Sequence, residues 1–273
     1  MDRTMRINLV GPGKVGQTLL RRMVDAGPCP PQDIFARREA AAEAARDFAG
    51  AGRAVSDLAA MRPADVWILT VPDGQISAVA EDLARLDLSP AIAVHCSGFH
   101  PSSILAPLSD RGWQVASAHP VLSFADPASA TAQFPGCHCG VEGPASAPVA
   151  ALFETLGARV FSIRTEAKAL YHAAAVISNN FTTVLQALAQ EAWAEAGVPE
   201  EVQADLQAVL LRGTVDNLLS RSPQAALTGP AARGDRAVVT AQAAEVAAWK
   251  PEAGTLYRVM SEMAVRLKTS GRT

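Results

Sequence analysis

The sequence contains few aromatic residues, few cysteines and no long run of apolar or basic residues, and each scarcity excludes a class of protein. Aromatics make up 5% of the 273 residues and the net charge is -3, so a nucleic acid is not an expected partner. No stretch has the roughly 18 uninterrupted apolar residues of a membrane helix. The charged start of the chain lacks the long apolar segment of a signal peptide. We therefore expect a cytoplasmic protein without a membrane segment.

The four cysteines are too few for a disulfide framework. Cys137 and Cys139 flank His138 in a spacing that resembles metal ligation, but in a strand the two thiols share one face and the imidazole takes the other. A zinc site would need further ligands. Cys29 and Cys96 are distant in sequence and form no second pair. We expect a structural strand here and no metal site.

What the chain does contain is a complete G-x-G-x-x-G between a short apolar run and a helical pattern. Its residues are Gly11, Pro12, Gly13, Lys14, Val15 and Gly16. Gly11 allows a sharp turn, Gly13 lets backbone amides approach a pyrophosphate, and Gly16 lets the helix pack against the strand. The helix N-terminus adds free N–H groups and a positive dipole end. A glycine-rich turn without a ligand is the alternative, but both flanks favour dinucleotide binding.

The distribution of strands and helices predicts an α/β fold of the Rossmann type. Apolar runs predict strands at residues 7–10, 33–37, 53–55, 65–71, 91–95, 114–118, 136–142 and 159–163. Helical patterns separate many of them, which argues for a mostly parallel sheet. After Thr165 only helices are expected, at residues 166–196, 200–219, 235–248 and 254–267. We therefore expect a dinucleotide-binding domain at residues 1–164 and an all-helical substrate and dimerisation domain at residues 165–273.

Four further residues are assigned to the cofactor. The second predicted strand ends at Arg37 and Arg38, where enzymes that prefer the unphosphorylated dinucleotide often carry an acidic residue. Two guanidinium groups suit a 2′-phosphate, which favours NADP over NAD; solvated surface arginines are the alternative. Val71 and Pro72 end a near-continuous apolar strand, at the edge where doubly wound sheets bind ligands.

Candidate substrate residues lie at strand ends and in a late loop. Ser97 and Gly98 could hold a carboxylate through a hydroxyl and backbone N–H groups, or could form a cap or turn. His119 ends a strand, and a histidine bonded to the backbone is its alternative. Thr228 and Arg233 could supply donors to an anionic substrate, because a guanidinium binds a carboxylate as a bidentate fork. A surface ion pair is the alternative for the arginine.

Polar residues also recur along the helical run that starts at Glu166. Lys168, His172, Ala175 and Asn179 are spaced by four, three and four residues and share one face, with Asn180 at its margin. A histidine can supply a proton to a carbonyl that is being reduced, and an asparagine can hold its oxygen. Lys168 is the rival acid, although its place near the helix start also allows it to be solvated. A core histidine bonded to a carbonyl is the alternative for His172.

Several motifs together resemble a family of NADP oxidoreductases that joins a Rossmann-like domain to a helical C-terminal domain of unknown function. They are the glycine loop, VPDGQI, HCSG, HPVLSF, LYHAAAVISNNF and LTGPAARGD. The last two are specific to the family, whereas GPGKVG is widely shared, and the resemblance covers nearly the whole chain. The architecture is similar to 3-hydroxyacid dehydrogenases, ketopantoate reductases and pyrroline-carboxylate reductases, with a C-terminal domain like that of 6-phosphogluconate dehydrogenase.

The resemblance implies a substrate and leaves the acid open. Some relatives are linked to the reduction of ketopantoate, which makes ketopantoate the leading named substrate. Related reductases carry a lysine, with an asparagine one helical turn on, in the first helix after the sheet. Here that helix offers Lys168, His172, Asn179 and Asn180, and the direct equivalent of the lysine is not fixed.

The sequence therefore predicts an NADP-dependent oxidoreductase that reduces a small oxo acid or an imine by hydride transfer, or oxidises the corresponding CH–OH donor. The nicotinamide is expected in a cleft near Val71, Pro72 and Ser97, which the helical domain closes. The same domain is expected to form a homodimer, because its long alanine-rich helix has more apolar surface than one small domain covers. The alternative is a regulatory protein that binds the dinucleotide without turnover and needs no proton donor.

Overall fold

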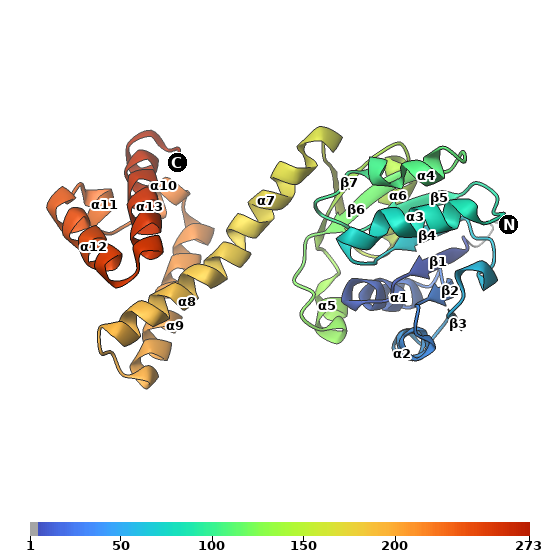
Figure 1. Ribbon diagram of the computed structural model, residues 1–273, viewed down its shortest axis with the longest axis horizontal. Coiled ribbons are helices and arrows are strands. Elements are labelled where there is room, and N and C mark those ends of the chain that lie inside the picture. Colours follow the sequence, from blue (N-terminus) through green and yellow to red (C-terminus); the bar gives the residue numbers. More distant parts are fainter. Residues whose placement is uncertain (1–4) are drawn as a thin grey trace. The chain divides into compact units, whose positions relative to one another are not determined.

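The computed structural model describes residues 5–273 (Figure 1). The chain divides into two compact units, Met1–Val176 and Ile177–Thr273. The first unit contains the whole sheet and extends into the helix that follows it. The domain boundary expected at residues 164 and 165 stays a prediction.

The first unit is built on one eight-stranded sheet. Its strands are β1 Ile7–Val10, β2 Pro31–Phe35, β3 Arg53–Val55, β4 Val66–Leu69, β5 Ile92–His95, β6 Gln114–Pro120, β7 His138–Glu142 and β8 Arg159–Ser162. The spatial order is β3-β2-β1-β4-β5-β6-β7-β8, and only the β6–β7 pair is antiparallel. The mostly parallel, Rossmann-like sheet predicted from the sequence is confirmed.

Helices cover both faces of the sheet. They are α1 Lys14–Ala26, α2 Glu39–Ala49, α3 Ile76–Arg85, α4 Ala106–Ser109, α5 Pro127–Gln133 and α6 Ser146–Thr155, with 3-10 turns η1 Leu58–Ala60, η2 Asp73–Gln75, η3 Ser102–Leu105 and η4 Thr165–Ala167. One apolar layer joins α1, α2 and α6 to one face, and a second joins α3 and α4 to the other. The central strand β4 is buried on both faces, which explains its unbroken apolar sequence.

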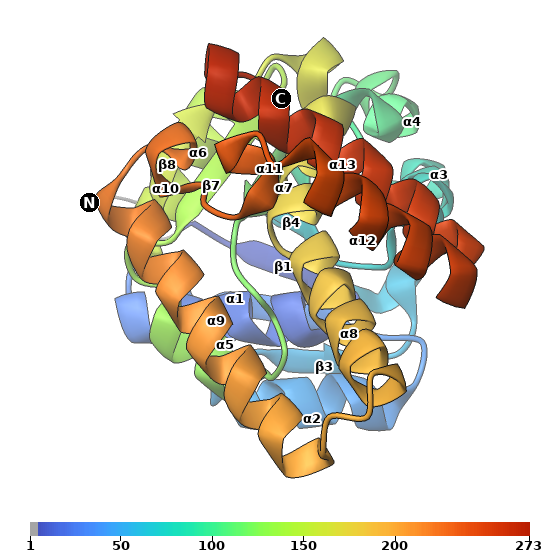
Figure 2. The ribbon, with the colours of Figure 1, turned by 90° about the vertical axis from the view of Figure 1, so that its left-hand side faces the viewer.

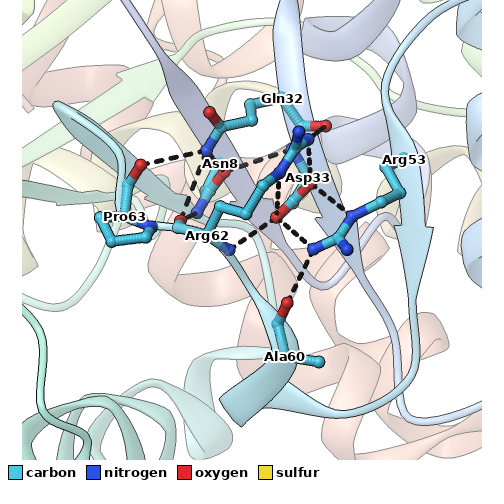
Figure 3. A network of polar contacts seen from close by, with 7 residues as sticks. All are labelled: Asn8, Gln32, Asp33, Arg53, Ala60, Arg62 and Pro63. Atoms are coloured by element: carbon cyan, nitrogen blue, oxygen red, sulfur yellow. Dashed lines mark hydrogen bonds and ion pairs between the residues drawn. The ribbon is translucent and has the colours of Figure 1, made fainter.

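A buried acidic residue ties the strands together near their amino ends (Figure 3). Asp33 on β2 is fully buried and accepts hydrogen bonds from Arg53 (2.9 and 2.8 Å) and from Arg62 Nη2 (2.6 Å). Asn8 on β1 donates to the Arg62 carbonyl oxygen (2.7 Å) and accepts from the Asp33 N–H (3.2 Å). Burial alone would raise the pKa of Asp33, but the bonds from the two arginines outweigh it and lower the pKa to about 2.

The second unit contains helices and no strand among its described residues. Helix α7 Lys168–Ser178 leads into it, and its own helices are α8 Asn180–Glu195, α9 Glu200–Ser220, α10 Pro223–Ala226, α11 Pro230–Arg233, α12 Arg236–Trp249 and α13 Pro251–Ser270. Within this unit α8 contacts α9. Helix α12 lies against α13 (Figure 2). A Cβ on Gly254 would lie 2.5 Å from Ala247 Cα, so the second contact needs a glycine.

Three expectations about the helices need correction. The run at residues 166–196 is not one helix: it opens with η4, and Asn179 (φ -108°, ψ -62°) separates α7 from α8. Asparagine is a poor residue inside a helix because its side chain competes for backbone hydrogen bonds. The sequence did not predict α5, which starts at Pro127 and is capped by Asp126. It also left residues 220–234 as a break, where α10 and α11 each begin at a proline.

Candidate functional site

The glycine loop between β1 and α1 is held in place from both neighbouring strands. Gly11 N donates to Phe35 O on β2 (2.9 Å), and Thr70 Oγ1, at the end of β4, donates to Gly11 O (2.7 Å). Gly11 has φ +85°, and a Cβ there would collide with Val71 Cγ1. Only glycine combines this turn with such a close approach to the next strand.

The other two glycines of the motif differ in their surroundings. A Cβ on Gly16 would lie 2.5 Å from Thr70 Oγ1 and 3.1 Å from Gly11 O, so this glycine seats α1 against the strand ends. A Cβ on Gly13 would meet nothing within 4 Å. Gly13 precedes α1, whose first intrahelical bond runs from Gln17 N to Gly13 O. The amides of Lys14, Val15 and Gly16 therefore have no acceptor within the helix and can bind an anion, whereas Gly13 N already donates to Gly11 O (2.8 Å).

A cavity of about 1000 Å³ opens over this loop. Its lining includes Gly11, Pro12, Gly13, Lys14, Val15, Arg37, Arg38, Val71 and Pro72, which is every residue assigned to the cofactor from the sequence except the buried Gly16. Phe35, Leu58 and Val79 add apolar surface. The open backbone, the free amides and the apolar walls fit a dinucleotide in shape and chemistry.

Arg37 and Arg38 lie between β2 and α2 at the rim of this cavity. Both side chains are exposed, and Arg38 is the N-cap residue of α2. Among the described residues neither arginine forms a salt bridge, in contrast to Arg46 further along α2, which pairs with Asp47. Two unpaired guanidinium groups beside a dinucleotide-sized cavity are available to a phosphate.

A second group of polar residues gathers beyond the carboxyl ends of β5 and β6. A Cβ on Gly98 would collide with His172 Cδ2 and lie 2.8 Å from His119 Nε2. The two imidazole rings stand nearly perpendicular, with their centroids 5.7 Å apart. The structure thus brings together Gly98, His119 and His172, which come from three separate stretches of sequence.

His119 has a partner that the sequence did not reveal. Its Nδ1 lies 3.0 Å from the hydroxyl of Tyr171. Burial, helped by the nearby His172 and Lys168, lowers the pKa of His119 to about 4, so this imidazole is neutral at physiological pH. Tyr171 immediately precedes His172 and lies on the face of α7 turned toward the sheet. Its position next to a candidate histidine is the sequence signal that could have identified its hydroxyl.

Ser97 is largely committed to the local turn. Its Oγ accepts hydrogen bonds from Phe99 N (3.1 Å) and His100 N (3.0 Å), which is the turn expected as its alternative role. Ser97 N lies 3.2 Å from His95 Nδ1, and His95 Nε2 lies 3.3 Å from Pro101 O. Burial lowers the pKa of His95 to about 3, so the neutral ring with its proton on Nε2 satisfies both bonds.

Lys168 is buried, so the solvated position that the helix start also allowed is not the one it takes. Its side chain is 1% exposed because it points from the first turn of α7 into the sheet. It hydrogen-bonds to Ser117 Oγ on β6, and its Nζ lies 3.8 Å from Glu142 Oε1 at the end of β7. Burial lowers the pKa of Lys168 to about 8, and Glu142 opposes that shift. The sequence did not predict roles for Ser117 and Glu142, because a single polar residue in a strand carries no distinctive signal.

The remaining candidates belong to the helical unit. Asn179 and Asn180 are exposed at the start of α8, and Thr228 is exposed in the loop before α11. Arg233 pairs with Asp235 through Nε (3.1 Å) and Nη2 (3.0 Å), which is the surface ion pair that the sequence left as its alternative. Their roles toward a substrate stay predictions.

The cysteine motif behaves as a strand segment. Cys139 is buried in β7 while the neighbouring His138 is exposed, so the two side chains take opposite faces. Within residues 5–273 no group of three histidine, cysteine or acidic side chains is placed to hold a metal ion. In the same part of the chain, no helix is long and apolar enough to cross a membrane.

Two family matches cover most of the chain. Residues 6–97 match the family described as "NADP oxidoreductase coenzyme F420-dependent", and residues 137–264 match "Domain of unknown function (DUF2520)". The matches confirm the pairing of domains that the sequence motifs indicate, and they support NADP as the cofactor. A comparison with curated proteins finds no match.

Solved structures share the whole architecture. Protein TM1727 from Thermotoga maritima has a TM-score of 0.77 and 29% identity, and the alignment covers 98% of this chain and 100% of that one. A Bacteroides fragilis protein provisionally described as an NADP oxidoreductase has a TM-score of 0.75 and 22% identity, covering 96% and 98%. A pyrroline-5-carboxylate reductase from Coxiella burnetii has a TM-score of 0.60 and 14% identity, covering 95% and 98%. The last two likenesses establish the fold alone.

Proposed function

We propose that the protein uses NADPH to reduce the C=O or C=N bond of a small anionic substrate. The premise is that the chain belongs to the NADP oxidoreductase family that carries a DUF2520 domain. The oxidoreductase class and the cofactor follow from the family. The substrate class, the residues of the site and the dimer are the proposed parts.

The supporting observation is that the dinucleotide cavity and the histidine pair lie at the ends of adjacent strands. Leu69 at the end of β4 pairs with His95 at the end of β5. The chain continues from Leu69 into Val71 at the cavity wall, and from His95 into Gly98 under the two imidazoles. This strand pairing supports a site in which groups that can exchange protons lie next to the cavity proposed for the dinucleotide.

The residues divide the work of cofactor binding and proton transfer. The amides of the glycine loop bind the pyrophosphate, and Arg37 and Arg38 bind the 2′-phosphate. Bound NADPH supplies the hydride. As the substrate carbon receives it, the N–H proton of a His172 imidazolium or a Lys168 ammonium passes to the substrate oxygen or nitrogen. The donor is left neutral and regains its proton from water, while neutral His119 orients the reacting group by hydrogen bonding.

An oxo acid such as ketopantoate and a cyclic imine such as pyrroline-5-carboxylate both fit this scheme. Both carry a carboxylate, for which Arg233, Thr228 and the Ser97–Gly98 turn are the proposed anchors. A panel of oxo acids and imines, with the loss of NADPH absorbance as readout, tests the proposal. Binding of NADPH by calorimetry without oxidation by any member of either class would favour the regulatory alternative.

We also propose that the helical unit forms a homodimer. Helices α8 and α9 contain no buried residue, and the large apolar side chains that they expose include Phe181, Val184, Val209, Leu210, Leu218 and Leu219. A second copy of the same surface would cover them. Light scattering should give twice the chain mass, and Val209→Asp combined with Leu210→Asp should yield a monomer, whereas Asp205→Ala on α9 should not. A monomeric wild-type protein would refute the dimer.

A further inference from the structure

Glu142 is a buried carboxylate whose two oxygens are both engaged. The residue as a whole is 3% exposed and lies at the end of β7. Oε1 accepts from Ser102 N (2.6 Å), and Oε2 accepts from Ser102 Oγ (2.9 Å) and from Thr165 Oγ1 (2.8 Å). These donors come from η3 and η4, on either side of the residue in sequence. A carboxylate fixed by two separate turns cannot swing away from its neighbours.

The neighbour that Glu142 faces is the Lys168 ammonium. Nζ lies 3.8 Å from Oε1, both side chains are 1% exposed, and Nζ also hydrogen-bonds to Ser117 Oγ. Removing a lysine from water disfavours its charged form, which lowers the pKa of Lys168 to about 8. Glu142 is foremost among the charges that act in the other direction. Protonation of Lys168 near neutral pH therefore depends on this carboxylate.

The other groups around Lys168 do not replace Glu142. Cys96, Cys139 and Asp73 also favour the charged lysine. Burial raises the pKa of both thiols, so they are neutral at physiological pH, and the effect of Asp73 is the smallest of these and lies behind that of Glu142. The charge of Lys168 also acts on His95 and His119, because it lowers the pKa of each. The charge on Lys168 thus reaches the imidazole that contacts Gly98.

We propose that Glu142 is a positioning residue for the reduction: it keeps the Lys168 ammonium protonated and fixed beside the His119–His172 pair, where the positive charge stabilises negative charge that develops on the substrate. The inference rests on the proposed function. Charge held in a dry, preorganised site stabilises a transition state more than it would in water. No bond to Glu142 forms or breaks, and the residue acts only through Lys168.

Direct titration of Lys168 tests the first half of the proposal without cofactor or substrate. The sequence has four lysines, Lys14, Lys168, Lys250 and Lys268, so lysine labelled with ¹³C at Cε gives a spectrum of four signals that Lys168→Met assigns. The wild-type midpoint is expected near 8. In Glu142→Gln it should fall by about 1–3 units, the usual effect of an adjacent opposite charge. Glu166→Gln is the matched control, because that side chain is exposed and pairs with Arg164.

Kinetics test the second half. In Glu142→Gln the alkaline limb of the kcat/KM profile should move to lower pH by the same amount as the NMR midpoint, with NADPH affinity unchanged. If Glu142→Gln fails to fold, Glu142→Asp serves instead, because it keeps the negative charge but moves it away from Lys168. The NMR midpoint and the alkaline limb should then both move to lower pH, but by less. The proposal would be overturned if the titration midpoint of Lys168 did not move in a folded variant. It would also be overturned if the midpoint moved but the alkaline limb of the kcat/KM profile did not. A shifted midpoint in a protein that reduces no substrate supports the charge-holding role and counts against the proposed function.

Discussion

Gly98 and His172 are in contact so close that no side chain fits between them. Gly98→Ala must therefore push the His172 and His119 rings apart. Overpacking of this kind typically costs about 1–3 kcal/mol, and the displaced rings should lower kcat. Urea unfolding and steady-state kinetics measure the two effects. Gly213→Ala is the matched control: its new methyl meets nothing within 4 Å on α9, and alanine in a helix should stabilise by up to about 1 kcal/mol.

The exposed arginines at the cavity rim should set the preference for the phosphorylated cofactor. Arg37→Ala and Arg38→Ala should each weaken NADPH binding by about 1.5–3 kcal/mol, the usual contribution of a hydrogen bond to a charged group, and leave NADH binding nearly unchanged. Calorimetry with both dinucleotides measures this. Arg46 lies on α2, which follows the arginine pair, and outside the cavity lining, so Arg46→Ala should behave like the wild type. If both rim variants keep the wild-type preference, the arginines are only surface residues.

The proton donor should be identified by comparing His172 with Lys168. General acid catalysis typically contributes about 10²–10⁴-fold, so His172→Ala should lower kcat within that range while NADPH affinity stays near wild type. Single-turnover kinetics separates this loss from slow product release. Turnover that survives His172→Ala but collapses in Lys168→Met would assign the proton to the lysine instead.

Arg233 should reveal its role through a substitution that keeps its charge. A lysine at this position retains the attraction to an anion but loses the planar fork. If Arg233 binds a substrate carboxylate, Arg233→Lys should lower kcat/KM clearly and leave kcat less affected. Asp235→Asn removes the present partner of Arg233 and separates this role from the ion pair. A kinetically silent Arg233→Lys would leave only the ion pair.

Acid should destabilise the first unit through Asp33. Its folded pKa of about 2 lies below the ordinary value of 3.8. The stability that Asp33 contributes is therefore fully present at pH values above 3.8 and is lost as the pH falls through about 2. The shift corresponds to about 2 kcal/mol. Asp33→Asn should therefore reduce the free energy of unfolding at neutral pH by about 2–3 kcal/mol and flatten its dependence on acid pH. Asp47→Asn, an exposed partner of Arg46, should change it by less than about 1 kcal/mol.

Local sequence carries the information for the glycine loop but not for the polar cluster. Gly11 and Gly16 reveal themselves because a turn and a close helix contact require glycine at fixed spacing. Glu142 and Lys168 lie in separate elements and meet only because β7 runs antiparallel to β6, which sets Glu142 beside Ser117. Helical spacing predicts the shared face of Lys168 and His172, but burial of the lysine depends on that pairing and cannot be read from α7 alone.

The order of strands gives the cavity over the glycine loop its place. The chain leaves β1 through α1 on one face of the sheet, and leaves the adjacent β4 through α3 on the other. Connections that depart in opposite directions from neighbouring strands leave a crevice at this topological switch point. Residues before β4 supply the glycine loop and the arginine pair, whereas residues after β5 supply the histidine pair and Glu142. If these groups serve the cofactor and the substrate as proposed, the two preferences depend on separate stretches of the chain and can diverge independently.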